Sequence, residues 1–245
     1  MAVKYILFDC DNTIVKSEDV AFAACAELVN EVLAKHGINE QFTGESLIAK
    51  FVGHNFRGIM EILQDDYNFK LSAEELNAYV STEVDRVITK LQAKAEPCDG
   101  SMEVLTKLYD EKKYKLAVVS SSALRRVQVS IAKTGQDKFF LADEVYSAAT
   151  SLPKPTSKPD PAIYLHVLDK YDVKPEECVA IEDSMSGATA AVRAKIPLIG
   201  YVGAYLTDAK KDEITDKFAS LGCTVVMRHW SEFEKCLAAI EAGRV

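Results

Sequence analysis

The fold of this chain is decided near its N-terminus by residues 3–13, whose sequence is VKYILFDCDNT. The first six of these residues form a compact run of mainly aromatic and β-branched side chains that ends at an acid, Asp9. Such a run is typical of a strand buried on both faces of a sheet. We therefore predict a buried strand over Val3–Phe8, with polar residues directly after its carboxyl end.

A helical block follows this strand. Residues 21–37, AFAACAELVNEVLAKHG, place apolar side chains three and four apart and end at Gly37, a plausible helix stop. Residues 72–94, SAEELNAYVSTEVDRVITKLQAK, show the same spacing and open with Ser72 and Glu75, the pattern of a capping box. No convincing strand interrupts this stretch, so we predict that residues 17–96 form an all-helical domain.

Strands and helices alternate after Pro97 and Gly100. The predicted strands are residues 115–120, 145–148, 178–181, 197–202 and 224–227, and the predicted helices include residues 101–112, 161–173, 187–195 and 231–243. This alternation is typical of a parallel sheet covered by helices on both faces. The predicted fold class is α/β: a Rossmann-like parallel-sheet core of residues 1–16 and 97–245, with an inserted helical cap domain of residues 17–96. The chain crossings near residues 15–17 and 96–100 are expected to lie side by side as hinges.

Composition and charge disfavour several kinds of partner. The 245 residues are 48% hydrophobic and carry a formal net charge of −8, which disfavours binding to nucleic acid or to an anionic membrane. The six cysteines include no CxxC pair, so we expect reduced thiols and no zinc site or disulfide. The apolar run at the N-terminus is too short for a leader segment. We predict a cytoplasmic protein, monomeric or weakly dimeric, without a membrane or nucleic-acid partner.

Polar clusters follow the predicted strands, at the edge where open α/β sheets bind their ligands. The first cluster contains Asp9 and Asp11. A carboxylate can attack phosphorus and form an aspartyl-phosphate. A second carboxyl group close by can protonate the leaving oxygen and then activate water. The same two acids would also suit a tight turn or a helix N-cap.

The second and third clusters could hold a phosphate group. Ser120 ends the strand 115–120 and Ser121 follows it. Hydroxyl and backbone N–H groups can form a phosphate cradle at such a strand end, although serines here also suit an ordinary loop. Lys158 lies in the sequence Lys-Pro-Asp-Pro, where its charge could neutralise both the carboxylate and the phosphoryl oxygens. Lys154 lies in another Lys-Pro pair and competes for this role. We favour Lys158 because its continuation leads directly into a helix.

The fourth cluster, Glu182 and Asp183, follows the buried strand 178–181. Two acids at the end of a buried strand are costly unless their charge is compensated. A hard cation such as Mg²⁺, held by carboxylate oxygens and the phosphate, would compensate them. The alternative is a helix start capped by Asp183 or Ser184.

Taken together, DxDxT at Asp9, the serine that ends a strand, the KPDP lysine and the EDSxxG block resemble the haloacid dehalogenase superfamily over residues 3 to about 202. The helical insertion resembles its C1 cap. The resemblance implies a Mg²⁺-dependent phosphatase with Asp9 as nucleophile and Asp11 as acid/base. It also places Ser120 and Lys158 on the phosphate. The metal would be held by Asp9, Asp183 and the backbone carbonyl of Asp11, with Glu182 joining them.

Further positions separate the branches of the superfamily that this chain resembles. The dehalogenases have no acid where this chain has Asp11, and the phosphonate-cleaving branch has alanine there, so P–O cleavage is favoured. Mutases of the beta-phosphoglucomutase type carry a cap Lys-Gly pair, an arginine three residues after that glycine, and a linker histidine. This chain has Val52, Phe56 and Ala21 instead. We therefore predict a phosphatase acting on a small phosphorylated metabolite: a sugar, polyol or small-acid phosphate.

Two alternatives stay open, a sugar-phosphate mutase and a non-catalytic binding protein on the same fold. The cap residues predicted to select the substrate share one loop: Lys50, His54, Asn55 and Arg57. His54 would equally suit the surface of the cap or a hinge.

Overall fold

The computed structural model describes residues 2–51 and 54–243. The helices found there are α1 (Glu18–Lys35), α2 (Gly44–Lys50), α3 (Phe56–Asp66), α4 (Ala73–Lys94), α5 (Ser101–Glu111), α6 (Leu124–Lys133), α7 (Ala162–Tyr171), α8 (Met185–Arg193), α9 (Asp208–Leu221) and α10 (Phe233–Glu241). The strands are β1 (Tyr5–Phe8), β2 (Val15–Lys16), β3 (Glu96–Pro97), β4 (Lys115–Ser120), β5 (Val145–Ser147), β6 (Cys178–Glu182), β7 (Leu198–Tyr201) and β8 (Val225–Met227). Across these residues, no helix combines the length and the apolar composition that crossing a bilayer requires.

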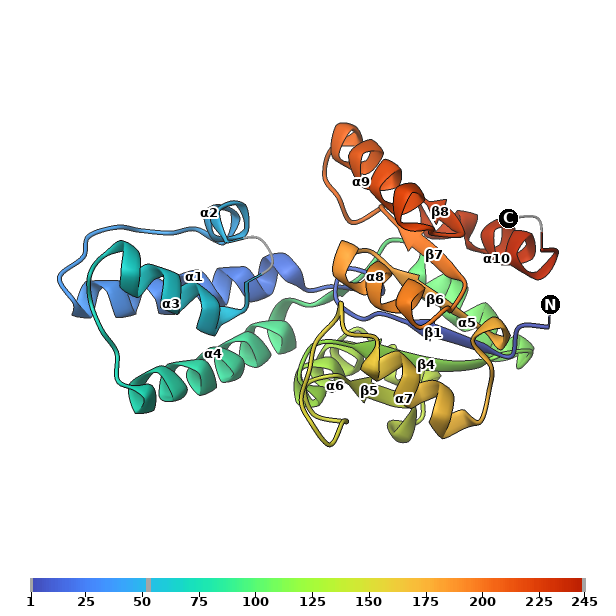
Figure 1. Cartoon of the computed structure of the whole chain (residues 1–245), viewed down its shortest axis with the longest axis horizontal. Coiled ribbons are helices and arrows are strands. Elements are labelled where there is room, and N and C mark those ends of the chain that lie inside the picture. Colours follow the sequence, from blue (N-terminus) through green and yellow to red (C-terminus); the bar gives the residue numbers. More distant parts are fainter. Residues whose placement is uncertain (1, 52–53, 244–245) are drawn as a thin grey trace. The chain divides into compact units, whose positions relative to one another are not determined.

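The chain divides into two compact units. One runs to Lys16 and resumes at Glu96, and the other comprises Ser17–Ala95. Within its described residues the second unit contains the helices α1 to α4 and no strand (Figure 1). The predicted fold class, an α/β sheet core with an inserted helical cap, is confirmed.

The cap unit has an apolar core of its own. Helix α1 packs against α2 and α4, and residues such as Leu33, Leu47 and Met60 are fully buried between the helices. Helix α4 begins at the predicted capping box. The Ser72 hydroxyl accepts from the amide of Glu75 (3.1 Å), and the Glu75 carboxylate accepts from the amide of Ser72 (2.8 Å). This pair satisfies amide groups that a helix start otherwise leaves unbonded.

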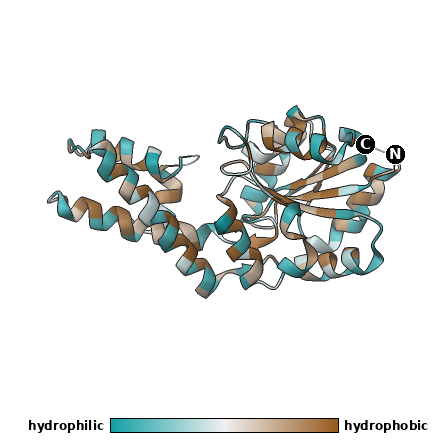
Figure 2. Ribbon diagram, turned by 90° about the horizontal axis from the view of Figure 1, so that it is seen from below, coloured by the Kyte–Doolittle hydropathy of each residue, from teal (hydrophilic) through white to brown (hydrophobic). Residues whose placement is uncertain are grey.

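The core unit is built on one parallel sheet with the strand order β5-β4-β1-β6-β7-β8. Strand β1 is central: Leu7 lies between Ala117 of β4 and Ala180 of β6. All four residues of β1 are buried, and the strands are apolar beneath helices that are polar on their outer sides (Figure 2). Because the strands are parallel, the polar residues at their carboxyl ends meet at a single edge.

The two chain crossings between the units pair with each other. Strands β2 and β3 are antiparallel, with Val15 opposite Pro97 and Lys16 opposite Glu96. The expected side-by-side arrangement of the crossings is therefore confirmed. The Lys16 ammonium group also contacts the carboxylate of Asp99 (2.6 Å) on the returning chain.

Helix α9 is the helix of the core unit that the sequence analysis did not predict; the two-residue strands β2 and β3 were also not predicted. Helix α9 spans Asp208–Leu221, and among its residues only Ile214 and Phe218 are buried. A helix with so narrow an apolar stripe lacks the spacing pattern on which the prediction of the other helices rested.

Candidate active site

Asp9 stands directly after the central strand, on a loop that the core holds firmly. Asn12 adopts φ = 56°, the left-handed conformation that asparagine tolerates better than most residues, and this reverses the chain. The buried indole of Trp230 donates from Nε1 to the carbonyl of Thr13 (3.1 Å). Asp9 and Asp11 therefore belong to an anchored turn and do not cap a helix, which settles one of the alternatives open at the sequence level.

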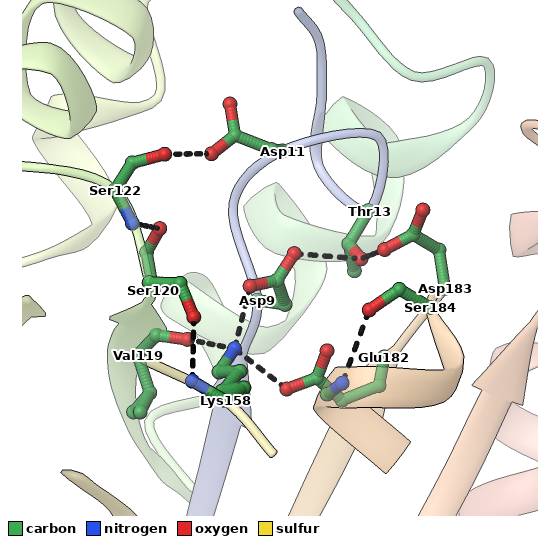
Figure 3. Close-up of polar contacts among 12 residues, drawn as sticks. Asp9, Asp11, Thr13, Val119, Ser120, Ser122, Lys158, Glu182, Asp183 and Ser184 are labelled. Atoms are coloured by element: carbon green, nitrogen blue, oxygen red, sulfur yellow. Dashed lines mark hydrogen bonds and ion pairs between the residues drawn. The ribbon is translucent and has the colours of Figure 1, made fainter. Parts of the chain in front are cut away.

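Lys158 joins the ends of three neighbouring strands. Its buried ammonium group lies 2.6 Å from Oδ1 of Asp9 and 2.6 Å from Oε1 of Glu182, and it donates to the carbonyl of Val119 (2.7 Å) (Figure 3). Lys154, the competing lysine, is exposed. The structure thus brings Lys158, and not Lys154, to the carboxylate of Asp9.

Glu182 has no exposed surface, and only one of its two carboxylate oxygens has hydrogen-bond partners among the described residues. Its Oε1 accepts from Lys158 and from the hydroxyl of Tyr164. Its Oε2 faces Gly187, where an added Cβ would lie only 1.7 Å from that oxygen. Glycine at this position therefore leaves room for the buried carboxylate against the first turn of α8.

Asp183 and Asp9 are linked by one hydroxyl group. Thr13 Oγ1 lies 3.2 Å from Oδ1 of Asp183 and 3.3 Å from Oδ2 of Asp9 (Figure 3). The next residue, Ser184, caps α8 by accepting from the amide of Gly187 (3.1 Å). The segment therefore contains both features considered for it, an acid pair at a strand end and a capped helix start.

The acid cluster has the donor set of a metal site. Asp9, Glu182 and Asp183 are buried, and each offers a carboxylate oxygen within 4.8 Å of the other two. Lys158 contacts two members of this cluster, Asp9 and Glu182, and its single positive charge is shared between them. Buried excess negative charge is costly unless a cation offsets it, and oxygen donors suit a hard divalent ion. The residues present fit such an ion.

The pKa values of the cluster are set mainly by its burial, which disfavours charged groups. Burial raises the pKa of the Asp9 carboxyl, and the charge of Lys158 opposes this shift. Burial likewise raises the pKa of Glu182, to about 7, again against the influence of Lys158. Burial disfavours the charge of Lys158 as well, but the two carboxylates outweigh it and hold the pKa of the lysine above its usual value. A further cation at the cluster would favour both ionised carboxylates.

The serine loop after β4 is ordered by its own hydrogen bonds. The buried hydroxyl of Ser120 accepts from the amide of Ser122 (3.0 Å), which leaves its own hydrogen to donate. The hydroxyl of Ser121 accepts from the amide of Lys158 (3.0 Å), so this loop also positions the lysine. The structure brings both predicted phosphate-binding serines next to Lys158, an arrangement that could receive phosphoryl oxygens.

The side chain of Asp11 is directed toward this serine loop and away from the carboxyl group of Asp9 (Figure 3). Its Oδ2 accepts from the hydroxyl of Ser122 (2.6 Å), and its Oδ1 accepts from Arg126 on α6 (3.0 Å). A metal contact through the backbone carbonyl of Asp11 remains a prediction.

Three of the four cap residues predicted to select the substrate have side-chain contacts inside the cap unit. Lys50 pairs with Asp66 (3.1 Å), and its ammonium group lies over aromatic rings of the same unit. Asn55 caps α3 by accepting from the amide of Gly58 (3.0 Å). Arg57 donates to Asn77 (2.5 Å), and His54 is exposed. Their role in substrate selection remains a prediction.

The sequence analysis assigned no role to several residues of this site. Thr13 belongs to the DxDxT motif, and that motif was the available clue to its contact with two carboxylates. Tyr164 looks like an ordinary core residue of a helix, and its hydroxyl bond to Glu182 has no local signature. The same holds for Arg126, which reaches Asp11 across more than a hundred residues of sequence, whereas Ser122 belongs to the run of three serines after the strand 115–120.

Comparison with known proteins identifies the family to which this chain belongs. The family described as haloacid dehalogenase-like hydrolase matches residues 6–201. The chain belongs to this family. The match spans the residues from β1 to the end of β7, including the helical insertion, and it confirms the resemblance inferred from the motifs.

Relatives in this family include named phosphatases. A phosphorylated carbohydrates phosphatase from Thermotoga maritima is 31% identical over 209 residues, which cover 84% of this chain and 88% of the relative. A 6-phosphogluconate phosphatase from Escherichia coli is 24% identical over 192 residues, covering 78% of this chain and 79% of the relative. These relatives support the predicted enzyme class, a phosphoric monoester hydrolase.

Among solved structures, a putative beta-phosphoglucomutase from Thermotoga maritima matches with a TM-score of 0.68 and 26% identity. The match covers 98% of this chain and 99% of that one. The proteins that resemble this chain therefore include both named phosphatases and a putative beta-phosphoglucomutase.

Proposed function

We propose that this protein is a Mg²⁺-dependent phosphatase that hydrolyses a small phosphorylated metabolite through an aspartyl-phosphate on Asp9. The observation that carries the proposal is the contact of the buried Lys158 ammonium group with Asp9 Oδ1 (2.6 Å), beside a cluster of three buried carboxylates. A lysine paired with a strand-end carboxylate favours its ionised, nucleophilic form and can also receive the charge of a phosphoryl group. The proposed substrate class is a sugar, polyol or small-acid phosphate, and the names of two relatives, which mention phosphorylated carbohydrates and 6-phosphogluconate, support the sugar and sugar-acid phosphates.

The chain's own residues supply each step of the proposed reaction. An oxygen of Asp9 forms a bond to phosphorus as the bond from phosphorus to the ester oxygen breaks. Asp11 gives its proton to that ester oxygen and later takes one from the water that attacks the aspartyl-phosphate. Ser120 and Lys158 donate to the phosphoryl oxygens as charge develops on them.

The metal in this proposal is Mg²⁺, held by Asp9 and Asp183, with Glu182 and the backbone carbonyl of Asp11 as further ligands. When bound, the ion would neutralise negative charge on the phosphoryl oxygens. The Oε1 atom of Glu182 contacts Lys158, so Glu182 would also act on the site by positioning that lysine.

The mutase is the second candidate, favoured by the match to a putative beta-phosphoglucomutase. Two positions weigh against it. Phe56, at the arginine position, and Ala21, at the linker-histidine position, are apolar and buried within the cap unit. The third position, Val52, lies outside the described residues. We therefore propose that water, and not a sugar hydroxyl, takes the phosphoryl group. A cytoplasmic location and a monomeric or weakly dimeric state complete the proposal.

A panel of phosphate esters tests this function. The protein is incubated with each ester and Mg²⁺, with and without a chelator, and free phosphate is measured together with any isomerised sugar phosphate. We expect steady phosphate release that needs no added bisphosphate and stops when the metal is removed. Isomerisation faster than phosphate release would replace this proposal with the mutase. No turnover of any ester would favour a non-catalytic binding protein.

A further inference from the structure

The acid–base residue of the proposed reaction is held by a residue outside its own loop. Arg126 lies in the first turn of α6 and donates to Oδ1 of Asp11 (3.0 Å), while Ser122 donates to Oδ2 (2.6 Å). The carboxylate therefore has a bond at each oxygen, one of them to a cation. Two such bonds restrict rotation of the side chain to a single arrangement.

The loop and helix that carry these two donors are themselves anchored. The hydroxyl of Ser147, at the end of β5, donates to the carbonyl of Ser122 (2.7 Å). The amide of Leu124, the first residue of α6, donates to the hydroxyl of Thr150 (3.2 Å). Ser122 and the start of α6 are thus hydrogen-bonded to β5 and the loop that follows it. These bonds restrict the movement of the two groups that donate to the Asp11 carboxyl.

The Asp11–Arg126 ion pair is also partly removed from water. The side chain of Arg126 is 23% exposed and that of Asp11 is 25% exposed. Ion pairs at fully exposed positions hold their geometry weakly, because water and salt screen them. A guanidinium group that is mostly covered can impose a defined direction on its carboxylate.

We propose that Arg126 is a positioning residue, which together with Ser122 fixes where the Asp11 carboxyl stands during phosphoryl transfer. The inference rests on the proposed phosphatase function. A general acid must come within hydrogen-bond reach of the leaving oxygen, and a side chain that rotates freely is only part of the time in that position. Since Arg126 bonds to Oδ1, the proton that Asp11 gives would be carried by Oδ2, with the Ser122 hydroxyl turned away in that step. Arg126 acts through Asp11 and makes no contact with the substrate in this proposal.

The test compares esters whose leaving groups differ in their need for a proton. With Mg²⁺ present, kcat/KM is measured for a series of substituted phenyl phosphates, from 4-nitrophenyl phosphate to unsubstituted phenyl phosphate. The proteins are the wild type, Arg126→Met, Arg126→Lys, Asp11→Asn and the double variant Asp11→Asn/Arg126→Met. Arg125→Met is the matched control, since Arg125 is an exposed neighbour of the same charge on the same helix.

We expect Arg126→Met to lower kcat/KM for phenyl phosphate about ten-fold, a part of the 10²–10⁴-fold that a positioned acid–base group contributes. The loss should be small for 4-nitrophenyl phosphate, whose leaving group needs little protonation. The dependence of rate on leaving-group pKa therefore becomes steeper. Arg126→Lys should recover part of the loss, because lysine keeps the charge without the planar fork. Arg125→Met should match the wild type.

The double variant decides how Arg126 acts. If it acts through Asp11, removing it from Asp11→Asn changes the leaving-group dependence no further. A loss that persists in the Asp11→Asn background would mean direct contact with the substrate, and an equal loss for all esters would mean a structural role. Either result overturns the inference. If the wild type turns over normally and Arg126→Met shows the same dependence of kcat/KM on leaving-group pKa, this inference is wrong and the proposed function is unaffected. No wild-type turnover removes the proposed function and the inference together.

Discussion

Replacing Lys158 with methionine should affect both stability and activity, because one ammonium group serves two buried carboxylates. It lies 2.6 Å from Asp9 and 2.6 Å from Glu182, and its side chain is only 3% exposed. Removing one partner of a buried ion pair leaves the other charge uncompensated, at a cost of about 3–5 kcal/mol. Removing a donor that would stabilise the phosphoryl oxygens should also lower kcat by about 10²–10³-fold.

The stability loss should depend on pH in a defined direction. Lys158 opposes the rise that burial causes in the pKa of Asp9 and Glu182, so its removal raises both folded-state pKa values further. A carboxyl group whose folded pKa is raised destabilises the fold once pH exceeds its unfolded value. Because wild-type Glu182 already has a folded pKa of about 7, the difference between variant and wild type should be small well below pH 7 and should grow as pH rises through 7 to 8 and above.

Denaturant unfolding of metal-free protein at several pH values, together with phosphate release at saturating Mg²⁺, measures both effects. Lys154→Met is the matched control, because Lys154 is exposed and also precedes a proline. It should retain wild-type stability and activity. A Lys158→Met protein as stable as the wild type at pH 8, or equal losses in the two variants, would refute this account of the site.

Three further predictions concern the acid cluster. Gly187→Ala would bring a Cβ within 1.7 Å of Glu182 Oε2, so we expect the free energy of unfolding to fall by about 1–3 kcal/mol, measured by thermal unfolding. The control Ser186→Ala lies on the exposed side of the same turn and should change the stability little. Because burial raises the pKa of Glu182 to about 7, Mg²⁺ binding should release protons and weaken as pH falls through 7. Calorimetry in two buffers of different ionisation enthalpy measures this release, and its absence at pH 6 would contradict the assigned shift. Asp183→Asn should raise the Kd for Mg²⁺ at least about ten-fold in the same calorimeter, and unchanged affinity would exclude Asp183 as a ligand.

Much of the architecture could be predicted because the spacing of apolar and capping residues along the sequence indicates where strands and helices lie. The strand predicted at residues 115–120 is β4, Lys115–Ser120, and Ser72 with Glu75 form the expected capping box. Buried parallel strands are continuous apolar runs, and this makes them visible in sequence. Helix α9 was missed because just two of its residues, Ile214 and Phe218, are buried.

The sequence predicted which residues lie at the candidate site, but it did not predict which side chains contact one another there. Asp9 and Ser120 follow from their places at strand ends, since parallel strands bring their carboxyl ends together, and Lys158 follows from its place before a helix. The contacts of Tyr164 and Arg126 depend on which helix turn faces the site, and that is fixed only by tertiary packing. The spacing of residues in the sequence does not indicate contacts between side chains that lie far apart in the chain.

The central claim is that Asp9 carries the phosphoryl group between substrate and water. Rapid acid quenching during turnover of 4-nitrophenyl phosphate, followed by mass spectrometry of the peptide that contains Asp9, tests it directly. We predict a phosphorylated fraction at Asp9 in the wild type with Mg²⁺, a larger one in Asp11→Asn because water is then activated poorly, and none in Asp9→Asn. Phosphate release by an Asp9→Asn protein at the wild-type rate, or a phosphoryl group on another residue, would contradict the mechanism.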